Sequence, residues 1–312
     1  MPLQASQVHI DAGLSNLSIA YRPSGFVADI VMPVLKVAKE SDLYFKWDRG
    51  NALRVPETKR ADGGESNKVT FDVTKNSTYH CEEYALNADV TDRQIANADS
   101  ILNLRATKTM YVKDLLMLDR EKRVATLLTT TGNYDSSVYT TLSGVNQWNN
   151  DSFVGSIEKD IDDGKEAVRG LIGHEPNIII IPAAVAKVVK RDAQVRELIK
   201  YTQNNLLVNG DLPPVLWNMK VVIPTAINIT SIKGHATTTT ADVWGKHVVM
   251  TYVPENGSIN TPAHAYTLRN RDWRVKTWRE ESKSKEVIEV SVIDDEIVTS
   301  DISGYLIYNA IA

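Results

Sequence analysis

Residues 99–130 read DSILNLRATKTMYVKDLLMLDREKRVATLLTT, and this stretch carries the strongest helical pattern in the chain. Neither proline nor glycine interrupts it, Asp99 and Ser100 can cap its start, and Gly132 follows its end. About 30 residues at 1.5 Å each make a rod of roughly 45 Å, long enough to act as a spine for other elements. Apolar residues at spacings of three, four and seven predict one buried face, formed by Ile101, Leu104, Tyr111, Leu115, Leu118 and Ala125.

The segment before this helix, residues 42–74, predicts one long β-hairpin. Apolar and polar residues alternate in 43–47 and again in 69–73, which is the period of a strand. The polar loop between the two strands is longer than a compact domain needs. At about 3.3 Å per residue, an arm from Leu43 to Thr58 spans roughly 50 Å. Residues 39–75 carry eight basic and seven acidic side chains, a mixture that suits pairing with charges on a neighbouring molecule.

The rest of the chain divides into an arm, a lobe and a β-rich end. Prolines and glycines interrupt residues 1–38, which predicts an extended arm. Residues 150–255 alternate helix and strand patterns, which predicts a compact α/β lobe. Its expected elements are a helix that starts at Ser156 and that Gly170 or Gly173 can end, a strand at 177–181, a helix at 183–201, and strands at 220–223 and 247–250. The remainder predicts strands at 274–279, 287–292 and 305–308.

Composition narrows the function classes. The 312 residues are 43% hydrophobic and 24% charged, ordinary values for a globular protein. A formal net charge of −4 argues against a general nucleic-acid binder, which needs a basic excess, but it allows a protein that only encloses nucleic acid. The single cysteine, Cys81, excludes an intrachain disulfide. We see no signal peptide pattern and no apolar run long enough for a bilayer, so no membrane partner is expected.

The motifs of enzymes and metal sites are missing. Neither phosphate-binding glycine motif occurs, and neither does a paired C-x-x-C or an H-E-x-x-H. The densest group of potential ligands is 80–83, His-Cys-Glu-Glu, but nothing points to further ligands. Acidic neighbours are expected to raise the pKa of Cys81, which favours an inert thiol over a nucleophile.

Two short patterns have a functional and a simpler interpretation. Ser282 and Lys285 fit S-x-x-K, but they lie in a charged turn without the other motifs of such a hydrolase. Asp294, Asp295 and Glu296 resemble paired carboxylates for acid–base work, and a solvated turn between strands is the simpler interpretation. We therefore assign no catalytic, cofactor-binding or metal-binding residue and expect no enzyme and no cofactor.

The chain resembles a known family, the major capsid (coat) proteins of tailed bacteriophages. The resemblance runs from about Phe26 to the C-terminus and rests on the order and spacing of its stretches as much as on each one. The matching stretches are FVADIVMPVLKVAKESDLYFKWDRG, VPETKRADGG, YALNADVTDRQIANAD, LDREKRVATLLTTTGNY, HEPNIIIIPAAVAKVVKRDAQVRELIKYT, LPPVLWNMKVVIPTAI and DWRVKTWREESKSKEVIEVSVIDDEIVTSDISGYLIYNAI.

The resemblance implies an α+β fold, the capsid shell fold of tailed phages, with a fixed set of parts. An N-terminal arm precedes an extended β-hairpin loop that lies on an adjacent subunit. A peripheral domain contains the spine helix, and an α/β axial domain surrounds the symmetry axes of the shell. In this chain the parts correspond to 1–38 for the arm, 39–78 for the extended loop, 79–140 and 266–312 for the peripheral domain, and 141–265 for the axial domain.

The resemblance also implies the partners. Identical copies form pentamers and hexamers of an icosahedral shell around double-stranded DNA, which is enclosed without sequence-specific binding. A scaffolding protein and the portal are implied partners, and a decoration protein is a further candidate. The protein is expected in the virion, and in the host cytoplasm during assembly. From the hairpin's length and charge we expect subunit-interface residues at Trp47, Arg49, Arg54, Lys59 and Arg60.

Two alternatives remain open from the sequence. A bacterial nanocompartment uses the same shell fold to enclose a cargo enzyme, and the contents of purified particles distinguish it from a capsid. An ordinary soluble α/β enzyme would elute as a monomer and respond to a small molecule in a thermal shift.

Overall fold

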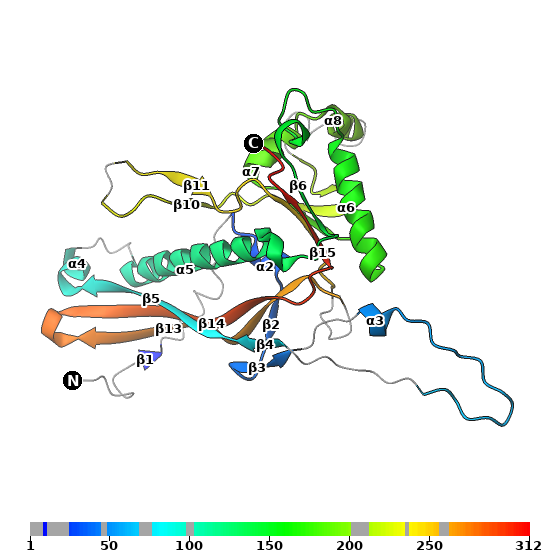
Figure 1. The fold of residues 1–312 in the computed structure, drawn as a ribbon. Coiled ribbons are helices and arrows are strands. Elements are labelled where there is room, and N and C mark those ends of the chain that lie inside the picture. Colours follow the sequence, from blue (N-terminus) through cyan, green and yellow to red (C-terminus); the bar gives the residue numbers. More distant parts are fainter. Residues whose placement is uncertain are drawn as a thin grey trace.

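The computed structural model describes residues 9–10, 25–44, 49–68, 77–97, 103–200, 212–234, 237–255 and 262–312, and these residues form an α+β fold with two main sheets (Figure 1). This confirms the expected mixture of helix and sheet. Among the helices in these ranges, none is long and apolar enough to cross a lipid bilayer.

The first sheet is built on one long antiparallel hairpin. Strands β13 and β14 are longer than the sequence patterns indicated, and Ser284 closes the turn between them with a φ of 48°. The strand β5 pairs with the outer side of β14, while β1 and β2 pair with β13. The bounds are β1 His9–Ile10, β2 Val34–Lys36, β5 Glu82–Thr91, β13 Ala265–Glu280 and β14 Lys285–Val298.

The helix α5, Leu104–Thr129, packs across this sheet and confirms the expected spine. Its N-cap is Asn103, whose side chain accepts a hydrogen bond from the Ala106 amide at 3.1 Å. The expected caps Asp99 and Ser100 lie outside the described residues. One part of the contact with the sheet is apolar and includes Val112, Leu116, Met117, Trp273, Val275, Ile288 and Val290.

The predicted buried face of this helix was wrong in part. Tyr111 is 58% exposed and Leu115 is 41% exposed, whereas Lys113, Arg120 and Glu121 are buried. The spacing of apolar residues predicted the wrong buried face because α5 also buries charged side chains, which have partners on other elements. Ala125 is buried as expected, Leu104 packs partly against the sheet, and Ile101 lies outside the described residues.

The second sheet forms the core of the α/β lobe, and its strand order is β6-β15-β12-β7-β9-β8. These strands are β6 Tyr139–Thr141, β7 Ile178–Ile180, β8 Val215–Leu216, β9 Met219–Val222, β12 Val248–Thr251 and β15 Gly304–Tyr308. The helix α6, Ile157–Ile172, starts and ends as expected: the Ser156 side chain caps its first turn, and Gly173 ends it at a φ of 75°.

Two expectations about this lobe need correction. The helix expected at 183–201 is two helices, α7 Ala183–Val189 and α8 Ala193–Lys200. The Asp192 carboxylate accepts from the Gln194 and Val195 amides and so starts a second helix. The strand β15, expected with the peripheral strands of 266–312, lies in the second sheet because its apolar residues complete that core. The domain division as a whole stays a prediction.

The smaller elements lie around these sheets. The helices are α2 Ala28–Val31, α3 Arg49–Ala52 and α4 Asp92–Asn97, with 3-10 turns at Thr131–Asn133, Gly144–Asn146 and Glu281–Lys283. Two-stranded sheets pair β10 Ile227–Ile229 with β11 Thr240–Asp242, and β3 Ser41–Tyr44 with β4 Ser77–His80.

The start of the predicted hairpin is present as β3, and it pairs with β4, a strand that the sequence patterns did not indicate. β3 and β4 pair antiparallel with Tyr44 opposite Ser77, while the strand expected at 69–73 lies outside the described residues, as do 45–48. After α3, residues 53–68 have no regular secondary structure, and all of them except Gly64 are exposed. Figure 1 shows this loop segment, residues 49–68, reaching away from both sheets.

We expect two glycines of α6 to respond oppositely to alanine. A Cβ at Gly164 would collide with Met250 and lie 2.8 Å from the Tyr305 ring, whereas a Cβ at Gly170 meets no heavy atom within 4 Å. Gly164→Ala should lower the free energy of unfolding by about 1–3 kcal/mol through overpacking. Gly170→Ala should raise it by about 0.5–1 kcal/mol through helix propensity. Urea unfolding of the dissociated subunit measures both, and equal stabilisation by the two variants would contradict this packing.

Candidate functional site

Glu121 is fully buried in the middle of α5 and collects hydrogen-bond donors from two distant segments. Its carboxylate accepts from the Ala28 amide at 2.9 Å, from the Val27 amide at 3.1 Å and from the Trp244 indole at 2.6 Å. Burial raises the pKa of Glu121, and the hydrogen bonds from Trp244 and the two amides oppose that rise. One carboxylate therefore holds the start of α2 and the turn before β12 against the spine helix.

Arg120, which precedes Glu121 in the sequence, is also buried but contacts other partners. Its guanidinium lies 2.6 Å from the Asp29 carboxylate and donates to the Thr267 hydroxyl at 3.1 Å. The Nε atom lies 3.6 Å from Glu296 and 3.9 Å from Asp294. Arg120 thus connects α2 and α5 to both long strands of the first sheet.

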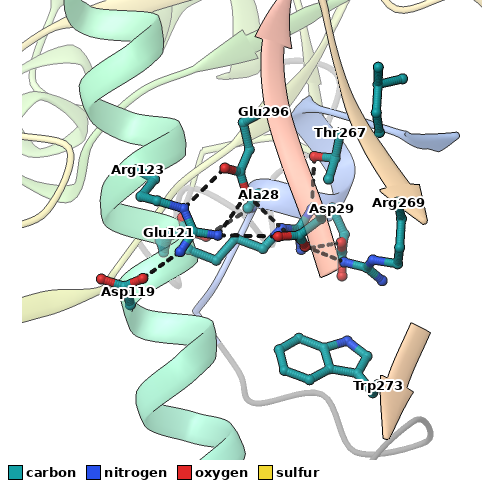
Figure 2. A network of polar contacts seen from close by, with 12 residues as sticks. Ala28, Asp29, Asp119, Glu121, Arg123, Thr267, Arg269, Trp273 and Glu296 are labelled. Atoms are coloured by element: carbon teal, nitrogen blue, oxygen red, sulfur yellow. Dashed lines mark hydrogen bonds and ion pairs between the residues drawn. The ribbon is translucent and has the colours of Figure 1, made fainter. Parts of the chain in front are cut away.

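Arg123 forms a second bridge from α5 to β14 (Figure 2). Its Nε and Nη2 atoms donate to the two Glu296 oxygens at 3.0 Å each, a bidentate geometry, and it also pairs with Asp119. The guanidinium lies 3.6 Å from the centre of the Tyr84 ring on β5. Burial disfavours the charged form, but the hydrogen bonds and charge of Glu296 prevail and raise the pKa of Arg123.

Asp294 lies completely buried at the centre of this group. Its oxygens lie 3.2 Å from Arg269 and 3.4 Å from Arg123. Burial and the charge of Glu296 raise the pKa of Asp294, while the three arginines oppose the rise. The expectation of a solvated turn at 294–296 was wrong, because these residues belong to β14 and two of them face α5.

We call Asp29, Arg120, Glu121, Arg123, Thr267, Arg269, Asp294 and Glu296 the buried charge network. It joins α2, α5, β13 and β14, as Figure 2 shows for most of its members. Sequence reasoning missed it. The available signal was the i, i+7 spacing of Lys113 and Arg120 beside Val112 and Leu116, which places charges on the face that packs against the sheet. The network holds these four elements together through ion pairs and hydrogen bonds.

The chemical candidates from the sequence do not form a reactive site. Burial, followed by the charge of Asp295, raises the pKa of the Cys81 thiol to about 11, so the thiolate is scarce at neutral pH. Lys285 lies 2.6 Å from Asp89, and that hydrogen bond raises the pKa of its ammonium group. Among the described residues, no three His, Cys, Asp or Glu side chains gather as a metal site would require.

Four of the five predicted interface residues lie in the loop segment. Arg49 is in α3 and helps to lower the pKa of Asp135, for which the hydrogen bonds from Ser137 are the main cause. Arg54 and Lys59 are exposed, and the Arg60 guanidinium donates to the Gly64 carbonyl at 2.5 Å within the loop. Trp47 lies outside the described residues. Lys59 and Arg60 are adjacent in the sequence and directly precede the turn at 61–64, and their role against a neighbour stays a prediction.

Comparison with known proteins gives two curated relatives, and no protein-family model matches the chain. The chain is 28% identical over 305 residues to the major capsid protein of Burkholderia phage BcepMu, an alignment that covers 96% of this chain and 95% of that protein. It is 30% identical over 186 residues to the major capsid protein of Pseudomonas phage JBD67, covering 60% and 58%.

Solved structures share the fold. A phage-related protein from Bordetella bronchiseptica RB50 has a TM-score of 0.75 at 23% identity, covering 96% of this chain and 97% of that one. The capsid of cyanophage P-SCSP1u has a TM-score of 0.64 at 10% identity, covering 93% and 89%. The holo-SrpI encapsulin complex from Synechococcus elongatus has a TM-score of 0.55 at 10% identity, covering 99% and 96%. The expected shell fold is thereby confirmed.

We expect Arg120→Met to lower the free energy of unfolding by about 3–5 kcal/mol, because it leaves buried carboxylates without their cation. The matched control is Arg169→Met, which removes an exposed arginine from a pair with Glu166 and should change stability by less than about 1 kcal/mol. Urea unfolding of the dissociated subunit at neutral pH compares the two. Equal, small effects would show that the network does not hold α2, α5, β13 and β14 together.

Proposed function

We propose that the chain belongs to the major capsid protein family of tailed bacteriophages, and that it builds the pentamers and hexamers of an icosahedral shell around a double-stranded DNA genome. It is a structural protein and not an enzyme, as its curated relatives are. Its place is the virion, and we propose that copies fold and assemble in the host cytoplasm. A scaffolding protein, the portal and a decoration protein are the proposed further partners.

The observation that carries this proposal is the loop segment. It reaches away from the subunit, its residues from 53 to 68 are exposed except Gly64, and it carries five basic and three acidic side chains over 49–68. Such a segment buries almost nothing within its own chain. It gains contacts only from another molecule, and in a homo-oligomer that molecule is a second copy.

We propose that Trp47, Arg49, Arg54, Lys59 and Arg60 form the subunit interface with an adjacent copy. The net positive charge of the loop segment suits carboxylates on the neighbour's spine helix and first sheet. Each exposed ion pair contributes little by itself. A closed shell makes many such contacts break together, so modest contacts give a stable particle.

A nanocompartment shell is the second candidate, and the similarity to the holo-SrpI encapsulin complex is the observation that favours it. Both functions use the same kind of self-assembling subunit. Particles purified from a phage-infected or induced host distinguish the two by their contents. Double-stranded DNA inside supports the capsid, and a defined cargo protein without DNA supports the compartment.

We expect the purified protein to form spherical or tubular assemblies in negative-stain electron microscopy. Deleting residues 50–66 should leave a folded subunit that fails to close shells, because the segment adds reach to a neighbour without contributing to the subunit core. Size-exclusion chromatography, circular dichroism and microscopy give the readout. If the deletion variant closes shells as the full chain does, the loop is not the connecting element.

A charge test keeps the loop intact. Arg54→Glu with Lys59→Glu should reduce the yield of closed particles at least tenfold at low salt, because like charges then face the neighbour's carboxylates. The matched control, Arg54→Lys with Lys59→Arg, retains both charges and should assemble normally. Equal yields from the two double variants would show that these positions do not meet an acidic surface.

A further inference from the structure

The strand β5 is an open edge of the first sheet. It pairs with β14 along its whole length, from Glu82 opposite Asp294 to Thr91 opposite Lys285. The opposite edge of the sheet is partly covered, since β1 and β2 both pair with β13. Within the described parts of the chain, no strand pairs with the outer side of β5.

The hydrogen-bond pattern identifies the backbone groups on this edge. The Asp92 amide donates to the Ser284 carbonyl, so even-numbered residues of β5 direct their backbone groups toward β14 and odd-numbered ones direct them outward. Two contacts agree with this alternation. The Cys81 amide donates outward to the Glu40 backbone carbonyl, and the Thr91 amide donates outward to the Gln94 side chain. Between these closed ends, the backbone groups of Glu83, Ala85, Asn87 and Asp89 point outward.

The middle of this edge lacks the side chains that usually prevent another strand from pairing with it. Proteins block long edge strands with lysine, proline or a covering element. Here 84–88 reads YALNA, with no charge and no proline, and Leu86 is 42% exposed. The strand carries three acidic residues and no basic one, although Glu83 and Asp89 already pair with Arg271 and Lys285.

The loop segment has the complementary features over residues 53–59. Leu53 and Val55 are 50% and 90% exposed and alternate with Arg54, as in a strand. Over 54–58 the described chain shows no backbone amide that donates a hydrogen bond. Pro56 fits an edge position, where the side without an N–H faces solvent. The basic side chains Arg54 and Lys59 suit the acidic strand.

We propose that residues 53–59 of one subunit add to the outer edge of β5 in the adjacent subunit as a further strand. This inference rests on the proposed shell function and names the docking surface of the loop. Main-chain hydrogen bonds to 83–89 hold the added strand, and its alternating side chains select the position. Leu53 and Val55 cover apolar surface at Leu86, while Arg54 and Lys59 approach the acidic ends of β5.

The first test blocks the edge without touching the pairing to β14. Asn87→Pro removes an outward N–H, and Leu86 before it keeps the extended conformation that a following proline favours. The matched control, Asn87→Ala, loses the same side chain and keeps the N–H. Asn87→Pro should give a folded subunit with at least a tenfold lower yield of closed particles by microscopy, while Asn87→Ala should assemble normally.

The second test reports the contact directly and does not depend on the proline variant folding. Subunits with Leu53→Cys or Val55→Cys are co-assembled with subunits carrying Leu86→Cys or Ala88→Cys, which share the face of the sheet that Leu53 and Val55 cover, and mild oxidation follows. Cysteines on adjacent strands lie near the separation of about 5.5 Å that a disulfide needs. At least one of the four pairs should give disulfide-linked dimers in particles but not in dissociated subunits. Val154→Cys, fully exposed elsewhere, is the control partner and should give none.

The outcomes separate this inference from the proposed function. A full-length protein that forms no shells overturns the function itself. If full-length shells form and the 50–66 deletion blocks them, but Asn87→Pro closes normally and no cysteine pair links, only the β5 docking surface is overturned. A failure of Asn87→Pro to fold leaves the decision to the cross-links, whose absence from well-formed particles would refute the added strand.

Discussion

The relative positions of α2, α5 and the first sheet depend on two adjacent residues of opposite charge that a single helix buries side by side. Arg120 and Glu121 have no contact with solvent, so each charge requires partners from the protein itself. The guanidinium finds Asp29, Thr267 and the β14 carboxylates, and the carboxylate finds the α2 amides and Trp244. Because none of these groups can leave without stranding a buried charge, α2, α5 and the first sheet hold one relative arrangement.

The loop segment differs from this rigid part, because its residues from 53 to 68 are exposed except Gly64. In the proposed shell, where one subunit meets several copies in slightly different surroundings, both properties are needed. A stiff body transmits the geometry of the lattice, and an extended strand tolerates small differences at its contact. The division between body and loop is therefore a division of mechanical roles along one polypeptide.

The sequence predicted well wherever a local rule acts alone. Ser156 and Gly173 bound α6 because capping and left-handed termination depend on single residues. The strands at 177–181, 220–223 and 247–250 follow from short apolar runs between breakers. Prediction failed where a residue far away in the sequence determines whether a side chain is buried. Arg120 and Asp294 are buried because charges far apart in the sequence satisfy one another, and Glu121 is buried because distant amides and the Trp244 indole donate to it. No local sequence pattern records these partners. The capsid shell fold came from the family resemblance, and the loop's interface residues remain a prediction.

The position of β15 has a consequence for the timing of synthesis. This strand lies between β6 and β12, yet the ribosome makes it after every other strand of the second sheet. A nascent chain that has not emerged past Tyr308 leaves β6 detached and one edge of β12 unpaired. Prematurely terminated chains therefore lack a finished lobe, because the last strand to be made is the one that joins β6 to the rest of the second sheet.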